Sequence, residues 1–288
     1  MLGLDPDPGA LWPGEERVGR VFGSPSEAAA AAVLGHCQAL IDATAPACVA
    51  VKPQLARFEA LGAAGWAALE AVVAHARGAG LLVIADGKRG DIDVSARAYA
   101  AALIDGMHTP FGHVDGLGAD MATVNPLMGR DAVEPFVQAA RQVAGGVLLL
   151  VRTSNPGAAD VEDLRLEGEG TVWERLARLV DELGAPGVGE AGISDVGAVV
   201  GATEPWRLER ARELMRSATF LLPGVGAQGG RVEELGAAFA PGRAGGLVSA
   251  SRSVSGAYLA AGGEPASAAR AAVERMREIA WRLSDRVR

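Results

Sequence analysis

The 288-residue sequence is poor in cysteine and in clustered positive charge. Cys37 and Cys48 are its only cysteines, too few to cross-link a chain this long and not a C-x-x-C pair, so we expect a reduced, cytoplasmic protein. Acidic residues outnumber basic ones, 35 to 27, and no basic cluster occurs, which argues against a nucleic-acid surface because phosphate backbones require concentrated Lys and Arg. No run of eighteen uncharged apolar residues and no signal-peptide pattern is found, so we expect neither a membrane span nor a secretory leader.

Lysine is also scarce. Of the 27 basic residues, two are lysines, Lys52 and Lys88, and the rest are arginines. A guanidinium, with a pKa above ~12, cannot release a proton at neutral pH, whereas an ammonium can. In a chain that otherwise uses arginine, each lysine can mark a position where arginine cannot substitute, although chance explains either one taken alone.

Short runs rich in Val, Ile and Leu alternate with longer amphipathic or alanine-rich stretches. We expect strands at 1–5, 47–52, 81–86, 119–124, 146–152, 196–201, 219–222 and 245–249. We expect helices at 25–43, 54–79, 91–105, 129–143, 170–184, 205–217, 231–240 and 264–286. The runs are continuously apolar, which suits parallel strands covered on both faces. Eight strand–helix pairs in under 300 residues predict an α/β fold, a (β/α)₈ TIM barrel spanning 1–288 as a single domain, with a doubly wound open sheet as the alternative.

The densest group of charged residues is DGKRGD, residues 86–91, directly after the apolar run LLVIA. Residues two apart in an extended segment share a face, so Asp86 and Lys88 are expected to point together. Gly87 and Gly90 are expected to let the chain turn before a helix opens at Asp91. A plain ion pair for Asp86 with Lys88, and a helix N-cap for Asp91, are the structural alternatives.

Lys52 ends another apolar strand and precedes Pro53, which suits a first helical turn. The lysine could simply extend to the rim of the fold. Two lysines and two aspartates at neighbouring strand ends would instead form an array of alternating charge, in which each group favours the ionised form of its neighbours.

The glycine-rich segment PGVGAQGG, residues 223–230, follows the seventh expected strand. Its G-x-G-x-x-G spacing weakly suggests a dinucleotide turn, but that turn belongs in the first βα unit. In a barrel, the loops after strands seven and eight commonly bind phosphate, and Arg252 would add a charge-assisted ligand. Tight turns alone are the alternative.

Two further segments are less specific. The hydroxyl and amide groups of RTSNP, residues 152–156, could bind a heterocycle or could cap the next turn. His108 and His113 lie in one connection without a third ligand at useful spacing, so we do not expect a metal site there.

With these motifs in order, the sequence resembles orotidine 5′-phosphate decarboxylases, and more closely the type 2 subgroup common in actinobacteria. The resemblance rests on GLDPDP (3–8), VKPQLARFEALG (51–62), DGKRGDI (86–92), TVNPLMGRD (123–131), RTSNPGA (152–158), VGAVVGAT (196–203), PGVGAQGG (223–230) and SASRSV (249–254). It implies a homodimeric barrel that converts orotidine monophosphate to UMP without metal or cofactor. The composition separately predicts a cytoplasmic protein with no nucleic-acid or membrane partner.

The resemblance also implies roles for individual residues. Lys88 would be the general acid that protonates C6 as carbon dioxide leaves, with Asp86 against the substrate carboxylate and Lys52 bridging to the ribose. Asp91 would reach the neighbouring subunit's site, and Ser95, where relatives usually have Thr, would contact ribose across the dimer. The other expected substrate contacts are Asp5 to ribose, Ser154 to the pyrimidine edge, Pro223 in the ring pocket, and Gln228 with Arg252 at the phosphate.

Two other functions remain open from the sequence. A sugar-phosphate decarboxylase or isomerase of the same architecture would usually need a metal near the D-x-K motif. A non-catalytic nucleotide-binding protein would use the glycine turn to bind a ligand without chemistry.

Overall fold

The computed structural model describes residues 1–15, 23–168, 170–226 and 228–285. The chain divides into two compact units. Unit 1 comprises Met1–Gly87 and Ala250–Arg277, and unit 2 comprises Lys88–Ser249 and Glu278–Arg288. The division falls within the D-x-K motif, between Gly87 and Lys88.

Unit 1 contains strands β1 (Leu2–Leu4), β2 (Ala50–Pro53) and most of β3 (Leu82–Arg89). They pair in parallel, with Gly3 opposite Lys52 and Val51 opposite Val83. The residues of β1 and β2 are buried throughout, as the continuous apolar runs require. The expected parallel arrangement is confirmed for this unit, and it places Lys52 near the carboxyl end of β2.

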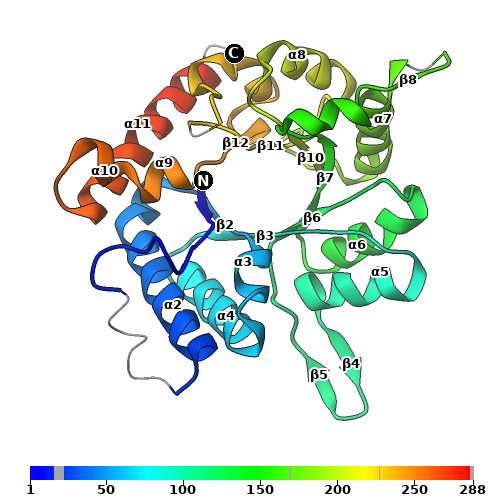
Figure 1. The fold of residues 1–288 in the computed structure, drawn as a ribbon. Helices are drawn as coiled ribbons and strands as arrows, with labels where there is room; N and C mark the ends of the chain where they lie inside the picture. The colour runs from blue at the N-terminus through cyan, green and yellow to red at the C-terminus, as the bar shows by residue number, and fades with distance from the viewer. Residues whose placement is uncertain (16–22, 169, 227, 286–288) are drawn as a thin grey trace. The chain divides into compact units, whose positions relative to one another are not determined.

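Helices α2 (Pro25–Thr44), α3 (Leu55–Glu59) and α4 (Gly62–Gly78) follow these strands, and α2 packs against α4 (Figure 1). Helix α2 begins with a capping box: the side chain of Ser24 accepts from the backbone N–H of Glu27, and the side chain of Glu27 accepts from the backbone N–H of Ser24. The single helix expected over 54–79 is wrong: the chain breaks between α3 and α4. Gly62 adopts φ +65, a left-handed conformation that interrupts a continuous helix.

In the described residues of unit 2, five strands run parallel in the order β6 (Met121–Val124), β7 (Gly146–Arg152), β10 (Val196–Val200), β11 (Phe220–Leu222) and β12 (Gly246–Val248). All five lie within the expected ranges. Their core is built from fully buried apolar side chains such as Leu148, Leu149 and Phe220. The carboxyl ends of neighbouring parallel strands meet at one edge, which brings the loops after β7, β10 and β11 together.

Unit 2 includes the helices α5 (Asp93–Ala100), continued by a π turn at Ala101–Asp105, then α6 (Arg130–Gln142), α7 (Val172–Gly184) and α8 (Pro205–Leu214). Helix α6 packs on β6 and β7, and α7 packs on β7 and β10. The α-helix expected over 231–240 is wrong: two 3₁₀ turns, Val232–Glu234 and Gly236–Phe239, occupy the segment. Gly236 lies inside it and Pro241 follows directly, and both disfavour a continued α-helix.

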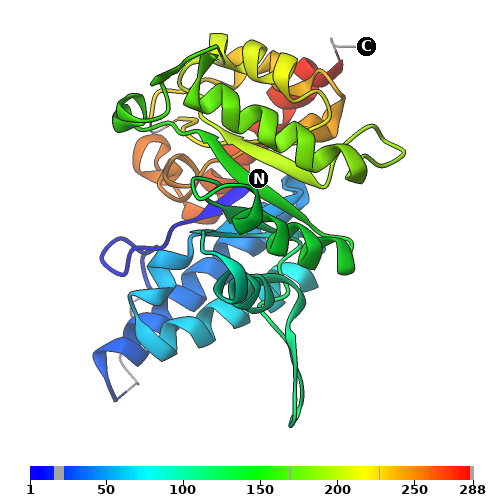
Figure 2. The same ribbon diagram turned by 90° about the vertical axis from the view of Figure 1, so that its right-hand side faces the viewer.

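The final helices are α9 (Arg252–Ser255), α10 (Ala257–Ala261) and α11 (Pro265–Asp285). The last helix was expected over 264–286, and Arg286 lies outside the described residues. Two short antiparallel hairpins of unit 2 were not expected: β4 (Met107–Thr109) with β5 (Gly112–Val114), and β8 (Arg165–Leu166) with β9 (Gly170–Thr171). Figure 2 shows the β4–β5 hairpin projecting beyond helix α5. Phe111, in the turn between the two strands, is fully exposed.

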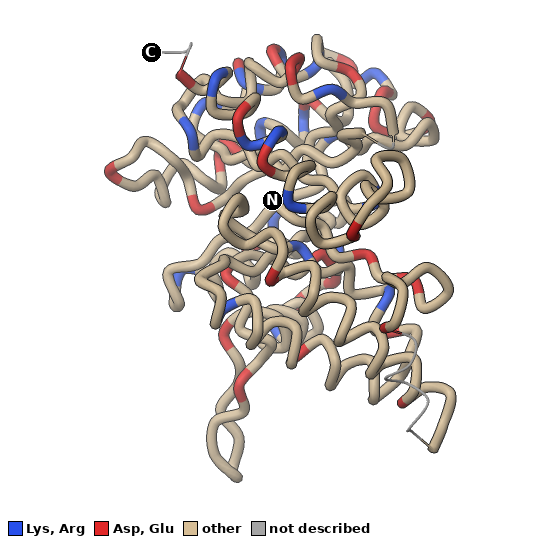
Figure 3. Tube along the Cα trace, turned by 90° about the vertical axis from the view of Figure 1, so that its left-hand side faces the viewer, with Lys and Arg blue, Asp and Glu red and all other residues tan. Residues whose placement is uncertain are grey.

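Charge is distributed unevenly over the helices (Figure 3). Helices α2 and α4 carry few charged residues, whereas about half of the short helix α8 is Arg or Glu.

The segment Pro25–Ala47 is long and apolar enough, by length and composition, to pass as a membrane span. Half of its most apolar window is buried inside the structure, as in the core helix of a globular fold, so the feature is weak grounds for a membrane role.

Candidate active site

Lys52 and Asp86 form a buried ion pair in unit 1. Lys52 Nζ contacts Asp86 Oδ2, and the two residues are 7% and 4% exposed. Removing two charges from water is costly unless they compensate each other, so each residue supplies the opposite charge that the other needs in this buried position. The sequence-based expectation that these strand-end residues meet is confirmed for Lys52 and Asp86.

Gln54 also belongs to this cluster and was missed from the sequence. Its Nε2 donates to Asp86 Oδ2 at 3.3 Å, and its backbone N–H donates to Leu4 O at 2.9 Å. Asp86 Oδ2 therefore accepts from both Lys52 and Gln54, which fixes the orientation of the carboxylate. The available signal was spacing, because Gln54 lies two residues after Lys52 in an extended segment and so on the same face.

Lys88 lies in an unusual backbone conformation. Its φ of +48 is in the left-handed region, and its N–H donates to the hydroxyl of Thr123 at 2.9 Å. Neither Gly87 nor Gly90, the two glycines expected to let the chain turn here, has positive φ, and Gly90 serves for close packing. A Cβ at Gly90 would lie 3.0 Å from the carbonyl oxygen of Asn125. Strain of this kind in a non-glycine residue is concentrated at functional sites.

Asp91 and Ser95 follow in unit 2. Asp91 is half-buried and its carboxylate accepts from the N–H of Ile92 at 2.8 Å. Ile92, not Asp91, occupies the N-cap position of α5, so the capping alternative for Asp91 is wrong. Ser95 is exposed on the first turn of α5.

Ser154 and Gln228 are brought together although 74 residues separate them. The Ser154 hydroxyl donates to Gln228 Oε1 at 2.8 Å. Glycines make this approach possible: a Cβ on Gly201 would lie 2.9 Å from Ser154 Cα, and one on Gly224, at φ +98, would lie 3.1 Å from Gln228 Oε1. Pro223 is half-buried at the start of the same turn.

The glycine-rich turn closes on itself through its backbone. Gly224, Gly226 and Gly229 all have positive φ, and the N–H of Gly230 donates to Gly224 O at 3.0 Å. Ala227, within the motif, lies outside the described residues. The glycines therefore form a tight turn, a geometry that the phosphate-binding prediction and its alternative share.

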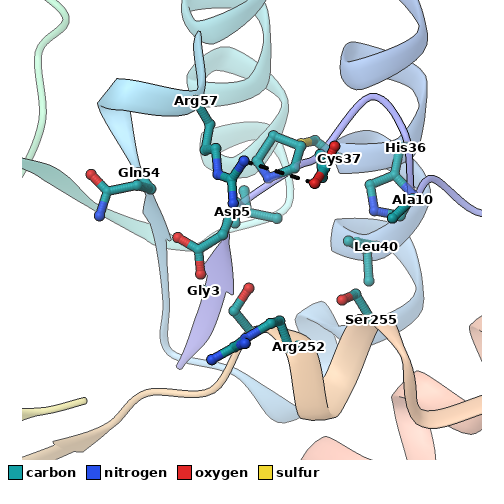
Figure 4. Close-up of a pocket in the computed structure, with 14 residues that line it drawn as sticks. Gly3, Asp5, Ala10, His36, Cys37, Leu40, Gln54, Arg57, Arg252 and Ser255 are labelled. Carbon is teal, nitrogen blue, oxygen red and sulfur yellow. Dashed lines mark ion pairs between the residues drawn. The ribbon is translucent and has the colours of Figure 1, made fainter. Parts of the chain in front are cut away.

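Asp5 and Arg252 line one cavity of about 430 Å³ within unit 1 (Figure 4). Asp5 is half-buried just after β1, and exposed Arg252 begins α9. Gln54 and Arg57 contribute to the same wall, and Arg57 is 3.9 Å from Asp7. The cavity therefore has carboxylates and guanidinium groups around one opening, which suits a ligand with hydroxyls and negative charge.

The far wall of this cavity is formed by His36 and Cys37 of α2. Burial lowers the pKa of His36 to about 4, and its Nδ1 accepts from the N–H of Trp12 at 3.2 Å, so the ring is neutral at neutral pH. Burial, with a smaller contribution from the charge of Asp5, raises the pKa of Cys37. The thiol stays protonated, which argues against a nucleophilic role for it.

No group of three or more His, Cys, Asp or Glu side chains in the described residues is arranged to hold a metal ion. His108 and His113 face each other across the β4–β5 hairpin with ring centroids 4.7 Å apart, and His113 is 3.4 Å from Asp115.

Comparisons with known proteins give one consistent result. The model of the orotidine 5′-phosphate decarboxylase/HUMPS family matches residues 29–272. An orotidine 5′-phosphate decarboxylase from Deinococcus radiodurans is 47% identical over 216 residues, covering 75% of this chain and 74% of its own. One from an Azoarcus species is 39% identical over 281 residues, covering 96% and 91%. The structure of Leishmania donovani OMP decarboxylase matches with TM-score 0.70 at 31% identity, covering 97% and 93%.

Proposed function

Because this chain belongs to the orotidine 5′-phosphate decarboxylase/HUMPS family, we propose that it converts orotidine 5′-phosphate to UMP and carbon dioxide. It is a carboxy-lyase of pyrimidine biosynthesis. The observation that carries the proposal, beside the family itself, is the buried Lys52–Asp86 pair, adjoining Lys88 in the motif D-x-K-x-x-D. Relatives named orotidine 5′-phosphate decarboxylase match this chain over most of their length, which makes this the best-supported function.

The proposed chemistry follows from the charges. Cleavage of the bond between C6 and the carboxylate leaves an electron pair on C6 as carbon dioxide departs. No conjugated group can accept that pair, so fixed cations must stabilise it electrostatically. Lys88 then transfers a proton from its ammonium to C6, which forms the C–H bond of UMP and leaves a neutral amine.

Lys52 and Asp86 prepare this step in the proposal. The Lys52 ammonium and the Gln54 amide hold one oxygen of Asp86, which orients the carboxylate toward the position of the substrate carboxylate. Two carboxylates close together raise the energy of the bound substrate, and that strain is relieved when carbon dioxide forms. Binding energy from the phosphate end of the substrate can offset the cost.

The remaining residues would bind the nucleotide. Asp5, half-buried beside the 430 Å³ cavity, suits a ribose hydroxyl, and Arg252 on the same cavity suits the phosphate. Ser154 would bind the pyrimidine edge, with Pro223 against the ring. Gln228, already bonded to Ser154, would link pyrimidine recognition to the phosphate turn. We expect no metal or cofactor in this chemistry.

We also propose that the three parallel strands of unit 1 and the five of unit 2 form one (β/α)₈ barrel, a single domain of residues 1–288. The order of strands and helices along the chain supports this arrangement. It would place the strand ends that carry Lys52, Asp86, Ser154 and Pro223 on one rim, where barrel enzymes bind their substrates.

The proposed assembly is a homodimer with shared sites, in which Asp91 and Ser95 of one subunit contribute to the site of the other. Mixing the single variants Lys88→Ala and Asp91→Ala tests it, because a mixed dimer regains one intact site. Random subunit exchange should then restore about a quarter of wild-type activity. No recovery, with exchange verified by mass spectrometry of tagged subunits, would contradict shared sites.

The function itself is tested by the absorbance change of orotidine 5′-phosphate on conversion to UMP, with and without EDTA. We expect equal turnover in both. Turnover abolished by EDTA would instead favour the metal-dependent sugar-phosphate enzymes of similar architecture. UMP binding without any turnover would favour a non-catalytic nucleotide-binding protein.

A further inference from the structure

We propose that Arg152 is a positioning residue: it fixes the peptide group that precedes Ser154 and so sets where the Ser154 hydroxyl meets the pyrimidine. The inference rests on the proposed function, because it assigns Ser154 the pyrimidine contact. All the residues that carry it belong to unit 2.

Arg152 ends strand β7 and is 6% exposed. The pairing of β10 with β7 shifts at this point, because Val199 pairs with Leu150 but the next residue, Val200, pairs with Arg152. A shift of this kind is a bulge, and bulges redirect side chains at strand ends near functional sites. The bulge therefore lies directly before the turn that carries Ser154.

The guanidinium of Arg152 bonds in two directions at once. Its Nη1 donates to the carbonyl oxygen of Thr153 at 2.7 Å. Its Nε and Nη2 donate to the two carboxylate oxygens of Asp163, each at 3.2 Å. The backbone carbonyl before Ser154 is thus tied, through one planar side chain, to a carboxylate ten residues further along the chain from Thr153.

The other side of Thr153 is held by Glu162. The Thr153 N–H donates to Glu162 Oε2 at 2.9 Å, and its hydroxyl is 3.0 Å from Glu162 Oε1. Glu162 Oε2 is in turn 3.5 Å from Arg152 Nη1. Both peptide groups of Thr153 therefore have charged partners, and hydrogen bonds to charged groups are stronger than neutral ones.

The hydrogen bond from Arg152 restrains Ser154 directly, because the carbonyl that it fixes belongs to the peptide that joins Thr153 to Ser154. Its backbone lies so close to Gly201 that a Cβ there would be 2.9 Å from Ser154 Cα. Its hydroxyl must also remain 2.8 Å from Gln228 Oε1. Small displacements of such contacts can cost about 100-fold in rate.

Arginine suits this task and lysine does not. Bonding the Thr153 carbonyl and both Asp163 oxygens together requires a planar fork of donors, which a single ammonium cannot supply with the same geometry. Asp163 is fixed from its other side by Arg207, whose Nη1 and Nη2 donate to it at 2.9 Å each. Burial alone raises the pKa of Asp163, but the hydrogen bonds and charges of Arg152 and Arg207 outweigh it and lower that pKa, so Asp163 remains ionised at neutral pH.

The test is a double-mutant cycle on kcat/KM for orotidine 5′-phosphate, with Arg152→Lys, Ser154→Ala and the double variant. Arg207→Lys is the matched control, because it perturbs the same Asp163 without touching Thr153. We expect Arg152→Lys and Ser154→Ala each to lower kcat/KM by about 10- to 100-fold. The double variant should be within about 3-fold of the worse single variant, since both changes remove the same contact.

Arg207→Lys should lower the thermal midpoint comparably to Arg152→Lys, yet change kcat/KM by less than about 3-fold. Multiplicative losses in the double variant would show that Arg152 acts independently of Ser154 and would overturn the inference. Equal activity losses in Arg152→Lys and Arg207→Lys would overturn it too, by reducing the role to general stability. A wild-type chain without turnover in the same assay would contradict the proposed function instead, so the two failures are distinguishable.

Discussion

Two buried cations, one in each unit, differ in residue type and in what surrounds them. Lys52 in unit 1 pairs with the carboxylate of Asp86 at the end of a strand. Arg212 in unit 2, at the end of α8, lies 3.8 Å above the ring of Phe220 and donates to backbone carbonyls. Those carbonyls belong to Met215, Arg216, Ala218, Ala238 and Gly245.

The difference separates two uses of buried charge. Arg212 donates to five carbonyl groups, so its planar fork stabilises the backbone. Burial lowers its pKa to about 10, which still leaves it charged at neutral pH. Lys52 instead contacts a side-chain carboxylate, Asp86, which also accepts from the amide of Gln54. Arg212 is thus a cation that holds the fold, whereas the two lysines lie where we propose that a cation takes part in chemistry.

The largest effect is expected from exchanging lysine for arginine at the proposed proton donor. Lys88→Arg keeps the positive charge but cannot release a proton at neutral pH, so kcat should fall by about 10³- to 10⁴-fold. Steady-state kinetics measures the loss, and calorimetric titration with UMP should show affinity within about 10-fold of wild type. Turnover within 10-fold of wild type would mean that a guanidinium can replace the ammonium at the proposed proton donor.

The reverse exchange, of arginine for lysine at the buried Arg212, should affect stability instead. Arg212→Lys offers three donors to five carbonyls and should lower the free energy of unfolding by about 2–4 kcal/mol. Urea denaturation measures this, while kcat should remain at the wild-type value. A change below about 0.5 kcal/mol would mean that the carbonyl contacts do not stabilise the fold.

Part of the fold and part of the candidate site can be predicted from the sequence alone. The eight parallel strands were predictable because continuous apolar runs are a local signal. The contact between Lys52 and Asp86 was predictable because both residues end such runs. The break at Gly62 and the 3₁₀ turns over 232–239 depend on backbone conformations that the helical pattern does not encode. Gln54 and Arg152 were missed as site residues because their significance depends on partners brought near by the fold, such as Asp86 and Asp163.

A smaller effect is expected from His36, a group in unit 1 that is buried uncharged. Its pKa is about 4 in the fold and near 6.5 when unfolded, so the unfolded chain binds more protons between these values. Stability should therefore be full above pH 6.5 and fall as the pH drops toward 4, by about 3 kcal/mol at most.

His36→Asn is the control for this effect, because an amide oxygen can still accept from Trp12 but does not titrate. The difference in unfolding free energy between wild type and variant, measured by urea denaturation from pH 7 to pH 4, should shrink in that window. A difference that does not change with pH would contradict a buried, neutral His36.

The smallest effect is expected from an exposed ion pair. Arg57 and Asp7 are 3.9 Å apart with both side chains about half exposed. Surface pairs contribute little, so Arg57→Gln should change the unfolding free energy by less than about 0.5 kcal/mol. A loss above 1 kcal/mol in urea denaturation would show that charge in unit 1 stabilises the fold more than the comparison with Arg212 allows.

The central claim, that Lys88 protonates C6 beside the Lys52–Asp86 pair, is tested most directly by a crystal structure with UMP bound. The account predicts Lys88 Nζ about 3–3.5 Å from C6, the reach of a proton transfer, with Asp86 next to it and the Ser154 hydroxyl on the pyrimidine edge. A nucleotide bound with C6 facing away from Lys88, or in a pocket that excludes Asp86, would contradict it.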